Sequence, residues 1–172
     1  MICTALAALA IGFAGSAPTG PKLVVTMGDG KTFTIVTDQK GSPKTVAHIL
    51  GLVKKKFYDG QKVHRVESWV TQWGDPGTKT QPVDSPGIGS GGSGKDVPFE
   101  SSKTSFVRGV VGLASTGAQV GGDSQLFVLK RDATYLDGNY AVVGVVTKGM
   151  SVVDAISRGA KIKSIRLAAK GK

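Results

Sequence analysis

Short runs of β-branched and apolar residues, bounded by glycine, proline or polar turns, recur along most of this chain, as is typical of buried or half-buried strands. They are predicted at residues 23–26, 32–37, 63–66, 70–73, 109–114, 125–129, 141–146 and 162–167. Helical periodicity occurs only within residues 41–57 and 149–159. Since strands and helices do not alternate, a parallel βαβ fold is excluded, and the pattern predicts a largely antiparallel barrel or sandwich.

The first helical segment carries its own start signals. Ser42 is a suitable N-cap, and Pro43 fits the first helical position. An apolar stripe follows at helical spacing, formed by Val46, Ile49, Leu50 and Val53. We therefore predict an amphipathic helix, with His48 off the stripe and exposed.

Residues 77–102 have no periodicity and are rich in glycine, serine and proline, which predicts a long surface loop. We expect residues 77–95 to be mobile and open to proteases. Gly89–Lys95 has the spacing of a phosphate-binding loop, but that motif needs Ser or Thr after the lysine and a helix beyond it. Asp96 follows instead, and Pro98 opposes helix initiation, so we exclude nucleotide binding here.

The first 20 residues carry no charge, and Ile2–Phe13 is an apolar run of signal-peptide length. We expect residues 1–20 to be a signal peptide or an apolar N-terminal arm, and residues 21–172 to form a single domain. The expected location is the periplasm or the exterior, with the cytoplasm as the alternative. Cys3 is the one cysteine and cannot form an internal disulfide.

The net charge of +10 indicates a solvated basic surface, with attraction to nucleic acid or an anionic envelope as the other interpretation. His48, His64 and Cys3 cannot complete a structural zinc site. A Gly-x-Ser-x-Gly nucleophile motif is also absent from the sequence. We expect no metal, no cofactor and no specific nucleic acid partner.

Polar residues interrupt three of the apolar strands: Arg65, Gln72 and Gln125. Arginine is rarely buried unless it is paired, so Arg65 either faces solvent or lines a groove. Aromatic residues accompany these positions, namely Trp69, Phe127, Tyr135 and Tyr140. Together they predict an apolar groove with a few fixed donors, which suits an extended peptide.

Five segments resemble the cyclophilin family of peptidyl-prolyl cis-trans isomerases, in that family's order and approximate spacing. They are "FYDGQKVHRV", "QWGDP", "GVVGLAS", "GGDSQLFVL" and "TYLDGNYAVVGVVTKGMSVVDAI". The resemblance, from about Leu23 to Leu167, implies a mainly-β fold, a closed antiparallel eight-stranded barrel capped by two α-helices. It implies isomerisation of X-Pro bonds during protein folding. A peptide-binding or chaperone module with little catalysis is the alternative.

The resemblance assigns Arg65 as the catalytic arginine and Gln72 as the glutamine that orients it. It assigns the other matched positions to substrate binding: His64, Trp69, Val70, Leu113, Ala114, Ser115, Gln125, Phe127, Tyr135, Leu136 and Tyr140. The implied partners are proline-containing peptides and unfolded or folding proteins, bound by a monomer. Tyr135 stands where the family often has tryptophan, which implies weakened ciclosporin binding. Without the resemblance, a lone strand histidine such as His64 indicates a hydrogen-bonded structural residue.

One segment departs from the family pattern. "HRVESWVTQ" is one residue shorter than usual and lacks the family's Pro-Gly turn, so Trp69 is predicted to sit differently from the phenylalanine common there. The chemistry still suits the residues present. Twisting an X-Pro amide localises a lone pair on nitrogen, and a fixed, permanently charged donor such as Arg65 stabilises it.

Overall fold

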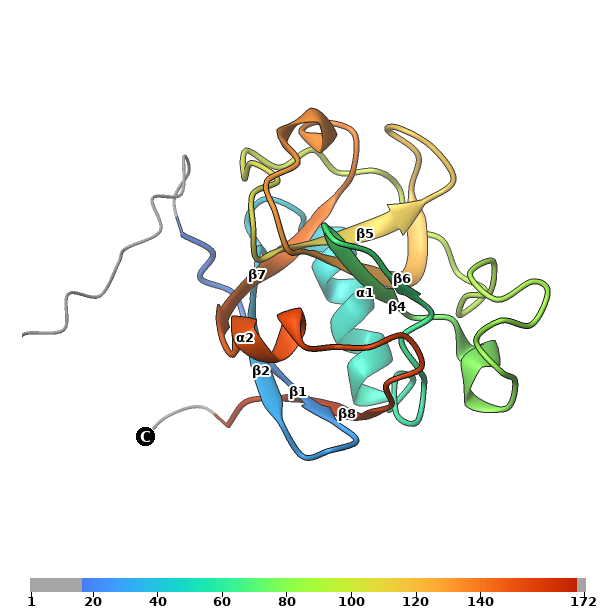
Figure 1. Ribbon diagram of the computed structural model, residues 1–172. Coiled ribbons are helices and arrows are strands. Elements are labelled where there is room, and N and C mark those ends of the chain that lie inside the picture. The colour runs from blue at the N-terminus through green and yellow to red at the C-terminus, as the bar shows by residue number, and fades with distance from the viewer. Residues whose placement is uncertain (1–16, 170–172) are drawn as a thin grey trace, which may run out of the picture.

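The computed structural model describes residues 17–169, which form one curled eight-stranded antiparallel sheet with two α-helices (Figure 1). The strands are β1 (Lys22–Met27), β2 (Thr32–Thr37), β3 (Arg65–Val66), β4 (Val70–Trp73), β5 (Val110–Ser115), β6 (Gly122–Leu129), β7 (Val142–Lys148) and β8 (Ile162–Leu167). Their order is β3-β4-β6-β5-β7-β2-β1-β8, and every neighbouring pair is antiparallel. The predicted mainly-β class is confirmed. Most of the segment expected to be a signal peptide or arm, residues 1–16, lies outside the described residues.

The two ends of this sheet, β3 and β8, do not pair with each other along their length. The segment before β3 instead meets the start of β8 and the residues just before it: Gly60 donates its N–H to the Ile162 carbonyl at 2.9 Å, and Val63 donates to the Ala160 carbonyl at 2.9 Å. β3 is only two residues long, which leaves no room for a regular ladder. The expected closed barrel is therefore corrected to a curled sheet whose ends are joined by irregular hydrogen bonds.

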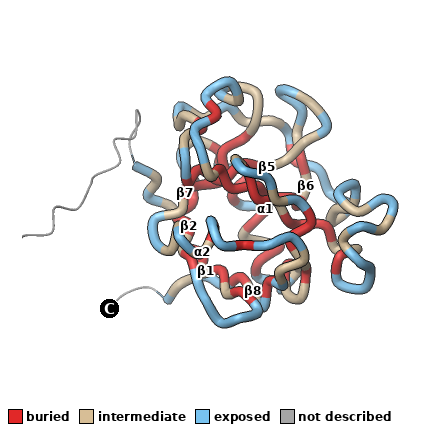
Figure 2. The backbone as a smooth tube through the Cα atoms, in the orientation of Figure 1, coloured by how far each residue is buried: buried red, intermediate tan, exposed pale blue. Residues whose placement is uncertain are grey.

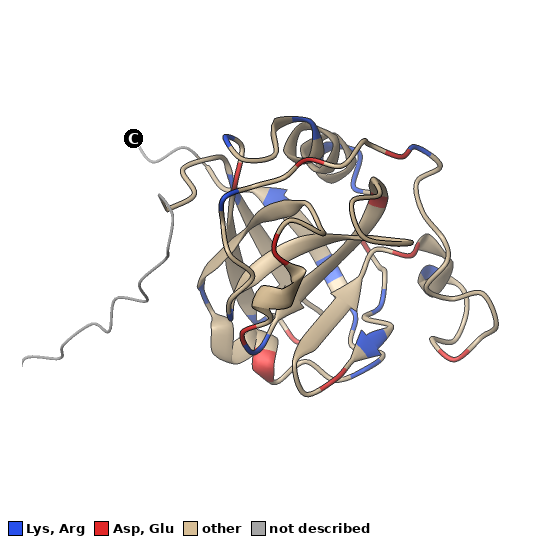
Figure 3. Cartoon of the chain, turned by 90° about the horizontal axis from the view of Figure 1, so that it is seen from above, with Lys and Arg blue, Asp and Glu red and all other residues tan. Residues whose placement is uncertain are grey.

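The two predicted helices are present as α1 (Pro43–Lys54) and α2 (Met150–Asp154). Helix α1 packs against β8 and α2 against β2. Two short 3₁₀ turns, η1 (Pro76–Lys79) and η2 (Thr134–Leu136), lie in the connections. Within residues 17–169, no helix has the length and apolar character needed to cross a membrane. Lysines and arginines are spread over many segments of the chain (Figure 3).

The start of α1 differs in detail from the prediction. Ser42 occupies the N-cap position, but its buried hydroxyl has no hydrogen-bond partner among the described residues. The carboxylate of Glu100 takes over this role from a distant loop, accepting from the backbone N–H of Lys44 at 3.0 Å and of Thr45 at 2.7 Å. A negative group at this position also suits the helix dipole.

Buried residues occur along most of the strands (Figure 2). Their side chains divide between two clusters on opposite faces of the sheet. Along β6, Leu126 and Val128 join the larger cluster, whereas Phe127 and Leu129 join the smaller one. This alternation is the two-residue period of a strand. The larger cluster fills the inside of the curled sheet and includes Trp73, which meets Phe33 edge to face. The smaller cluster forms the base of the candidate site.

The predicted surface loop is present, and it extends to the right in Figure 1. Two carboxylates hold it. Asp75 accepts from backbone N–H groups of the loop, and Asp123 accepts from the hydroxyl of Ser93 and from the N–H of Gly94 at 2.8 Å. Mobility of residues 77–95 stays a prediction.

Candidate active site

Arg65 and Gln72 face each other across the β3–β4 hairpin, where they are paired residues in the ladder. The Arg65 guanidinium donates from Nη1 to the Gln72 side-chain oxygen at 3.2 Å. It also lies over the Trp69 ring, 5.4 Å from the centroid. The side chain is 43% exposed, so it is held by neighbours and open to solvent at once.

Glu67 is a neighbour of Arg65 that the sequence analysis missed. Its carboxylate accepts from Arg65 Nε at 2.7 Å and from the indole N–H of Trp69 at 2.7 Å. These two hydrogen bonds hold the pKa of Glu67 below its usual value, and the bond from Arg65 has the larger effect. Glu67 lies in the turn between β3 and β4, where an acidic residue is ordinary, so the sequence carried no signal for it.

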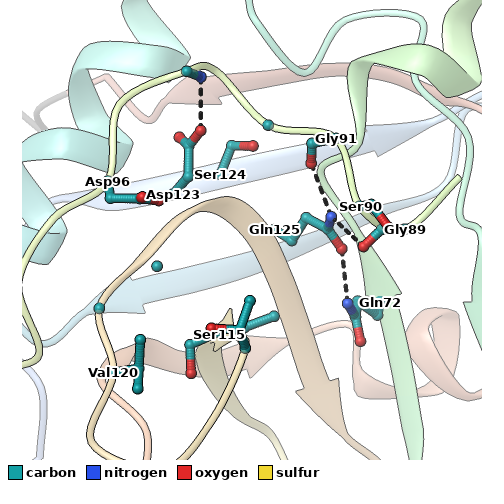
Figure 4. Close-up of a pocket in the computed structure, with 16 residues that line it drawn as sticks. Gln72, Gly89, Ser90, Gly91, Asp96, Ser115, Val120, Asp123, Ser124 and Gln125 are labelled. Carbon is teal, nitrogen blue, oxygen red and sulfur yellow. Dashed lines mark hydrogen bonds between the residues drawn. The ribbon is translucent and has the colours of Figure 1, made fainter. Parts of the chain in front are cut away.

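Gln72 is itself oriented by a second glutamine. Its Nε2 donates to Oε1 of Gln125 on β6 at 2.8 Å. Nε2 of Gln125 donates to the carbonyls of Gly89 at 2.8 Å and Gly91 at 2.9 Å. Figure 4 shows Gln125 between Gln72 and the two loop carbonyls. We call Arg65, Gln72 and Gln125 the amide relay.

A small cavity of about 170 Å³ lies beside Arg65. Its lining consists of Arg65, Trp69, Val70, Gln72, Ala114, Ser115, Phe127, Leu136 and Tyr140. Phe127 stacks on Phe106 with centroids 5.8 Å apart and meets Tyr140 edge to face. Gly112 makes room for that ring, because a Cβ there would lie 2.6 Å from Phe127 Cε1. The result is an apolar cavity with one cationic edge.

A larger cavity of about 530 Å³ adjoins the first and shares Gln72, Ala114 and Ser115 with it. Glycines of the long loop and of the β5–β6 turn form much of its wall, together with Gln125 and the acidic residues Asp96 and Asp123 (Figure 4). The two cavities therefore form one continuous depression, with the small cavity beside Arg65 at one end.

Most of the residues that the sequence analysis assigned to the site meet here. Arg65, Trp69, Val70, Gln72, Ala114, Ser115, Phe127, Leu136 and Tyr140 line the small cavity, and Gln125 lines the larger one. Trp69 therefore reaches the cavity although its segment is shortened, and its contact with Glu67 occurs where the family's Pro-Gly turn is missing.

Two assigned residues, Leu113 and Tyr135, do not line either cavity. Leu113 is buried in the larger core cluster, because alternation along β5 turns it inward and Ala114 outward. Tyr135 lies on η2 and is 68% exposed, outside the small cavity that its neighbour Leu136 helps to line. Binding roles for these two residues stay predictions.

His64 is also outside both cavities. It is buried beneath the loop near Gly89, and neither ring nitrogen has a hydrogen-bond partner among the described residues. Burial lowers its pKa, while the nearby Asp75 opposes that shift. Its backbone carbonyl accepts from Arg158 Nε at 2.8 Å, and the interpretation of its ring as a hydrogen-bonded structural group stays a prediction.

The second histidine, His48, was expected to be exposed, and that expectation is wrong. Its side chain is only 9% exposed, with Nε2 3.3 Å from an oxygen of Asp123. In the part of the chain that the structure describes, no three His, Cys, Asp or Glu side chains gather closely enough to hold a metal ion. Cys3 lies outside that part.

Comparison with known proteins identifies the family. The family model for cyclophilin type peptidyl-prolyl cis-trans isomerases matches residues 22–170. This chain belongs to that family, as its motifs indicated.

Curated relatives carry the same kind of name. A probable peptidyl-prolyl cis-trans isomerase of Brucella abortus (strain 2308) is 39% identical over 127 residues, which cover 72% of this chain and 65% of that protein. The match thus spans about two thirds of the relative's length. Peptidyl-prolyl cis-trans isomerase B of Bacillus subtilis (strain 168) is 30% identical over 142 residues, covering 81% of this chain and 92% of that protein.

A solved structure agrees in fold. The Cryptosporidium parvum cyclophilin type peptidyl-prolyl cis-trans isomerase superposes with a TM-score of 0.74 at 19% identity, covering 88% of this chain and 99% of that one. At this identity the likeness shows the cyclophilin-like fold alone.

Proposed function

We propose that this chain is a peptidyl-prolyl cis-trans isomerase that acts on X-Pro bonds in proline-containing peptides and in unfolded or folding proteins. The observation that carries the proposal is the position of Arg65, held by Gln72 at the edge of an apolar cavity. The names of its relatives support the same activity. A second structure of the Cryptosporidium parvum protein was obtained in the presence of the dipeptide Ala-Pro, in keeping with a proline-containing substrate.

The proposed reaction needs one well-placed donor and an apolar wall. Rotation about the X-Pro bond breaks amide resonance, with a barrier of about 18–20 kcal/mol. The twisted nitrogen gains a localised lone pair, which a guanidinium can stabilise more than it stabilises the planar amide. Among the described residues, Nε and Nη1 of Arg65 have acceptors and Nη2 has none, so Nη2 is the donor we assign to the substrate.

The apolar wall must supply the remainder of the acceleration. Uncatalysed isomerisation takes tens to hundreds of seconds, so millisecond turnover needs roughly five decades, or about 7 kcal/mol. One preorganised donor typically contributes about 2.7–4 kcal/mol. Phe127, Val70 and Leu136 would hold the prolyl ring and exclude water while the preceding carbonyl rotates.

The decisive experiment is a protease-coupled isomerase assay on a proline peptide. Arg65→Ala should lower turnover about 10²- to 10³-fold, and Arg65→Lys should restore only part, because an ammonium lacks the planar fork that Gln72 orients. Phe127→Ala should weaken peptide binding as well as turnover, since the ring contacts ground and transition states alike. Thermal melts establish that each variant is folded. A folded Arg65→Ala protein that is as fast as wild type would overturn the assignment.

The alternative is a peptide-binding or chaperone module with little catalysis. One observation favours it: the Arg65 guanidinium is already paired with Glu67. Peptide binding by the wild-type protein, without acceleration of isomerisation, would select this alternative.

Further properties follow as proposals. We propose that the protein acts as a monomer. We also propose that it binds ciclosporin weakly, because Tyr135 lies outside the small cavity. We also propose export to the periplasm or the exterior. N-terminal sequencing of protein from its native host should then begin near Ala17 or Pro18, and a product that keeps Met1 would contradict export.

A further inference from the structure

Asp75 is a buried carboxylate next to the amide relay, with no part assigned in the reaction. It is 2% exposed and lies two residues beyond β4. One oxygen accepts from the N–H of Gly77 at 2.8 Å. The other accepts from the N–H groups of Gly89 at 2.6 Å and Gly91 at 3.0 Å. Three backbone donors satisfy this carboxylate without a basic partner among the described residues.

Gly89 and Gly91 are each held from two sides. Their N–H groups point to Asp75, and their carbonyls accept from Nε2 of Gln125. The approach is too close for a side chain at Gly91, where a Cβ would lie 2.5 Å from Asp75 Oδ1. Asp75 therefore fixes the positions of the two carbonyls that Gln125 contacts.

Counting donors and acceptors shows what those carbonyls control. A carbonyl only accepts, so Gln125 must present its NH₂ to the loop and its oxygen to Gln72. Gln72 then presents its own NH₂ to Gln125 and its oxygen to Arg65, which only donates. The loop carbonyls and Arg65 thus impose the same bond directions from the two ends of the relay, and Asp75 fixes where the loop end lies.

We propose that Asp75 is a positioning residue for prolyl isomerisation, which orients Arg65 through Gly89, Gly91, Gln125 and Gln72. This inference rests on the proposed function. Asp75 touches no substrate itself, since it lines neither cavity. Its effect should therefore disappear when Gln125 is removed, whereas a merely structural effect would persist.

The test is a double-mutant cycle of wild type, Asp75→Asn, Gln125→Ala and the double variant. Asp75→Asn keeps the shape but offers one oxygen in place of two. We expect it to lower kcat about 3- to 10-fold with a smaller change in KM, and to change kcat less than about 2-fold in the Gln125→Ala background. If the loss is equally large in both backgrounds, or if folded Asp75→Asn is as active as wild type, the inference fails.

Asp84→Asn is the matched control. Asp84 lies on the same loop and pairs with Arg158, but it is 73% exposed and contacts no member of the amide relay. This variant should keep wild-type kcat and KM. Should Asp75→Asn fail to fold, Gly91→Ala displaces the Asp75 carboxylate by contact, and the same cycle with Gln125→Ala applies.

A second readout separates this inference from the proposed function. The NMR signals of the Gln125 side-chain NH₂ and of Arg65 Nε–H should shift, and the NH₂ should exchange faster, in Asp75→Asn but not in Asp84→Asn. These signals report on the relay whether or not the wild type isomerises proline. An inactive wild type would thus overturn the function alone, and unchanged signals would overturn the relay.

Discussion

At the scale of single residues, Arg65 has two acceptors of different charge: the neutral amide of Gln72 and the carboxylate of Glu67. The carboxylate orients the guanidinium and at the same time opposes its positive charge. The pair is 43% and 46% exposed. Exposed ion pairs contribute only about 0.2–1 kcal/mol. Glu67 therefore has only a small effect on the orientation of the Arg65 guanidinium and on its positive charge.

We predict that Glu67→Gln lowers kcat/KM by about 2- to 5-fold, the change that corresponds to a surface ion pair. Arg65 Nε and Trp69 Nε1 donate to different oxygens of Glu67, and a glutamine replaces one of those oxygens by an NH₂ group that cannot accept. One of the two hydrogen bonds is then lost, so KM should rise as the Trp69 wall loosens. Asp154→Asn is the control, because its pair with Arg108 has similar exposure but does not line the small cavity. A gain in activity, or a loss as large as that of Arg65→Ala, would contradict this account.

Residue types made some of the site predictable. An arginine and two glutamines within apolar strands conflict with burial, and this conflict identified Arg65, Gln72 and Gln125. Glu67 and Asp75 raised no such conflict, because acidic residues in turns are ordinary. Their importance depends on which donors the folded chain brings to them, and two of the three donors to Asp75 are 14 and 16 residues away along the sequence.

At the scale of elements, the start of α1 is stabilised by a loop residue 55 positions away. Both oxygens of Glu100 accept backbone N–H groups there, whereas the Ser42 hydroxyl is buried without a partner among the described residues. Strand positions followed from local patterns to within a few residues. The cap of α1 did not follow from the local pattern. The local candidate, Ser42, competes with the carboxylate of Glu100, which only the tertiary fold brings to the helix.

We predict that Glu100→Ala destabilises the protein by about 1–2 kcal/mol, the usual cost of losing a helix cap. Ser42→Ala should change the free energy of unfolding little or raise it slightly, because it removes a buried hydroxyl that lacks a partner. Urea denaturation of both variants checks the comparison. If Ser42→Ala is the more damaging change, the serine is the cap after all.

At the scale of the whole molecule, the fold buries a neutral histidine, and this gives its global stability a pH dependence. Burial lowers the pKa of His64 below its ordinary 6.5, and the positive charges of Arg158 and Arg65 act in the same direction, while Asp75 opposes them. The carboxyl pKa values of Asp59 and Asp154, lowered by Arg166 and Arg108, affect stability in a separate window below 3.8. The intermediate range therefore reports mainly on histidine.

We predict that stability is greatest above about pH 6.5 and falls as the pH decreases from there toward the folded-state pKa of His64. In that window the unfolded chain binds a proton that the folded protein resists, so stability rises with pH, with a slope of at most about 1.4 kcal/mol per pH unit for one group. His64→Leu should flatten the dependence and remove two buried nitrogens without partners among the described residues. His48→Gln is the control, since the other histidine contacts Asp123 instead. Denaturant melts between about pH 5 and pH 7 measure the slopes. Parallel curves for wild type and His64→Leu would assign the pH dependence to another group.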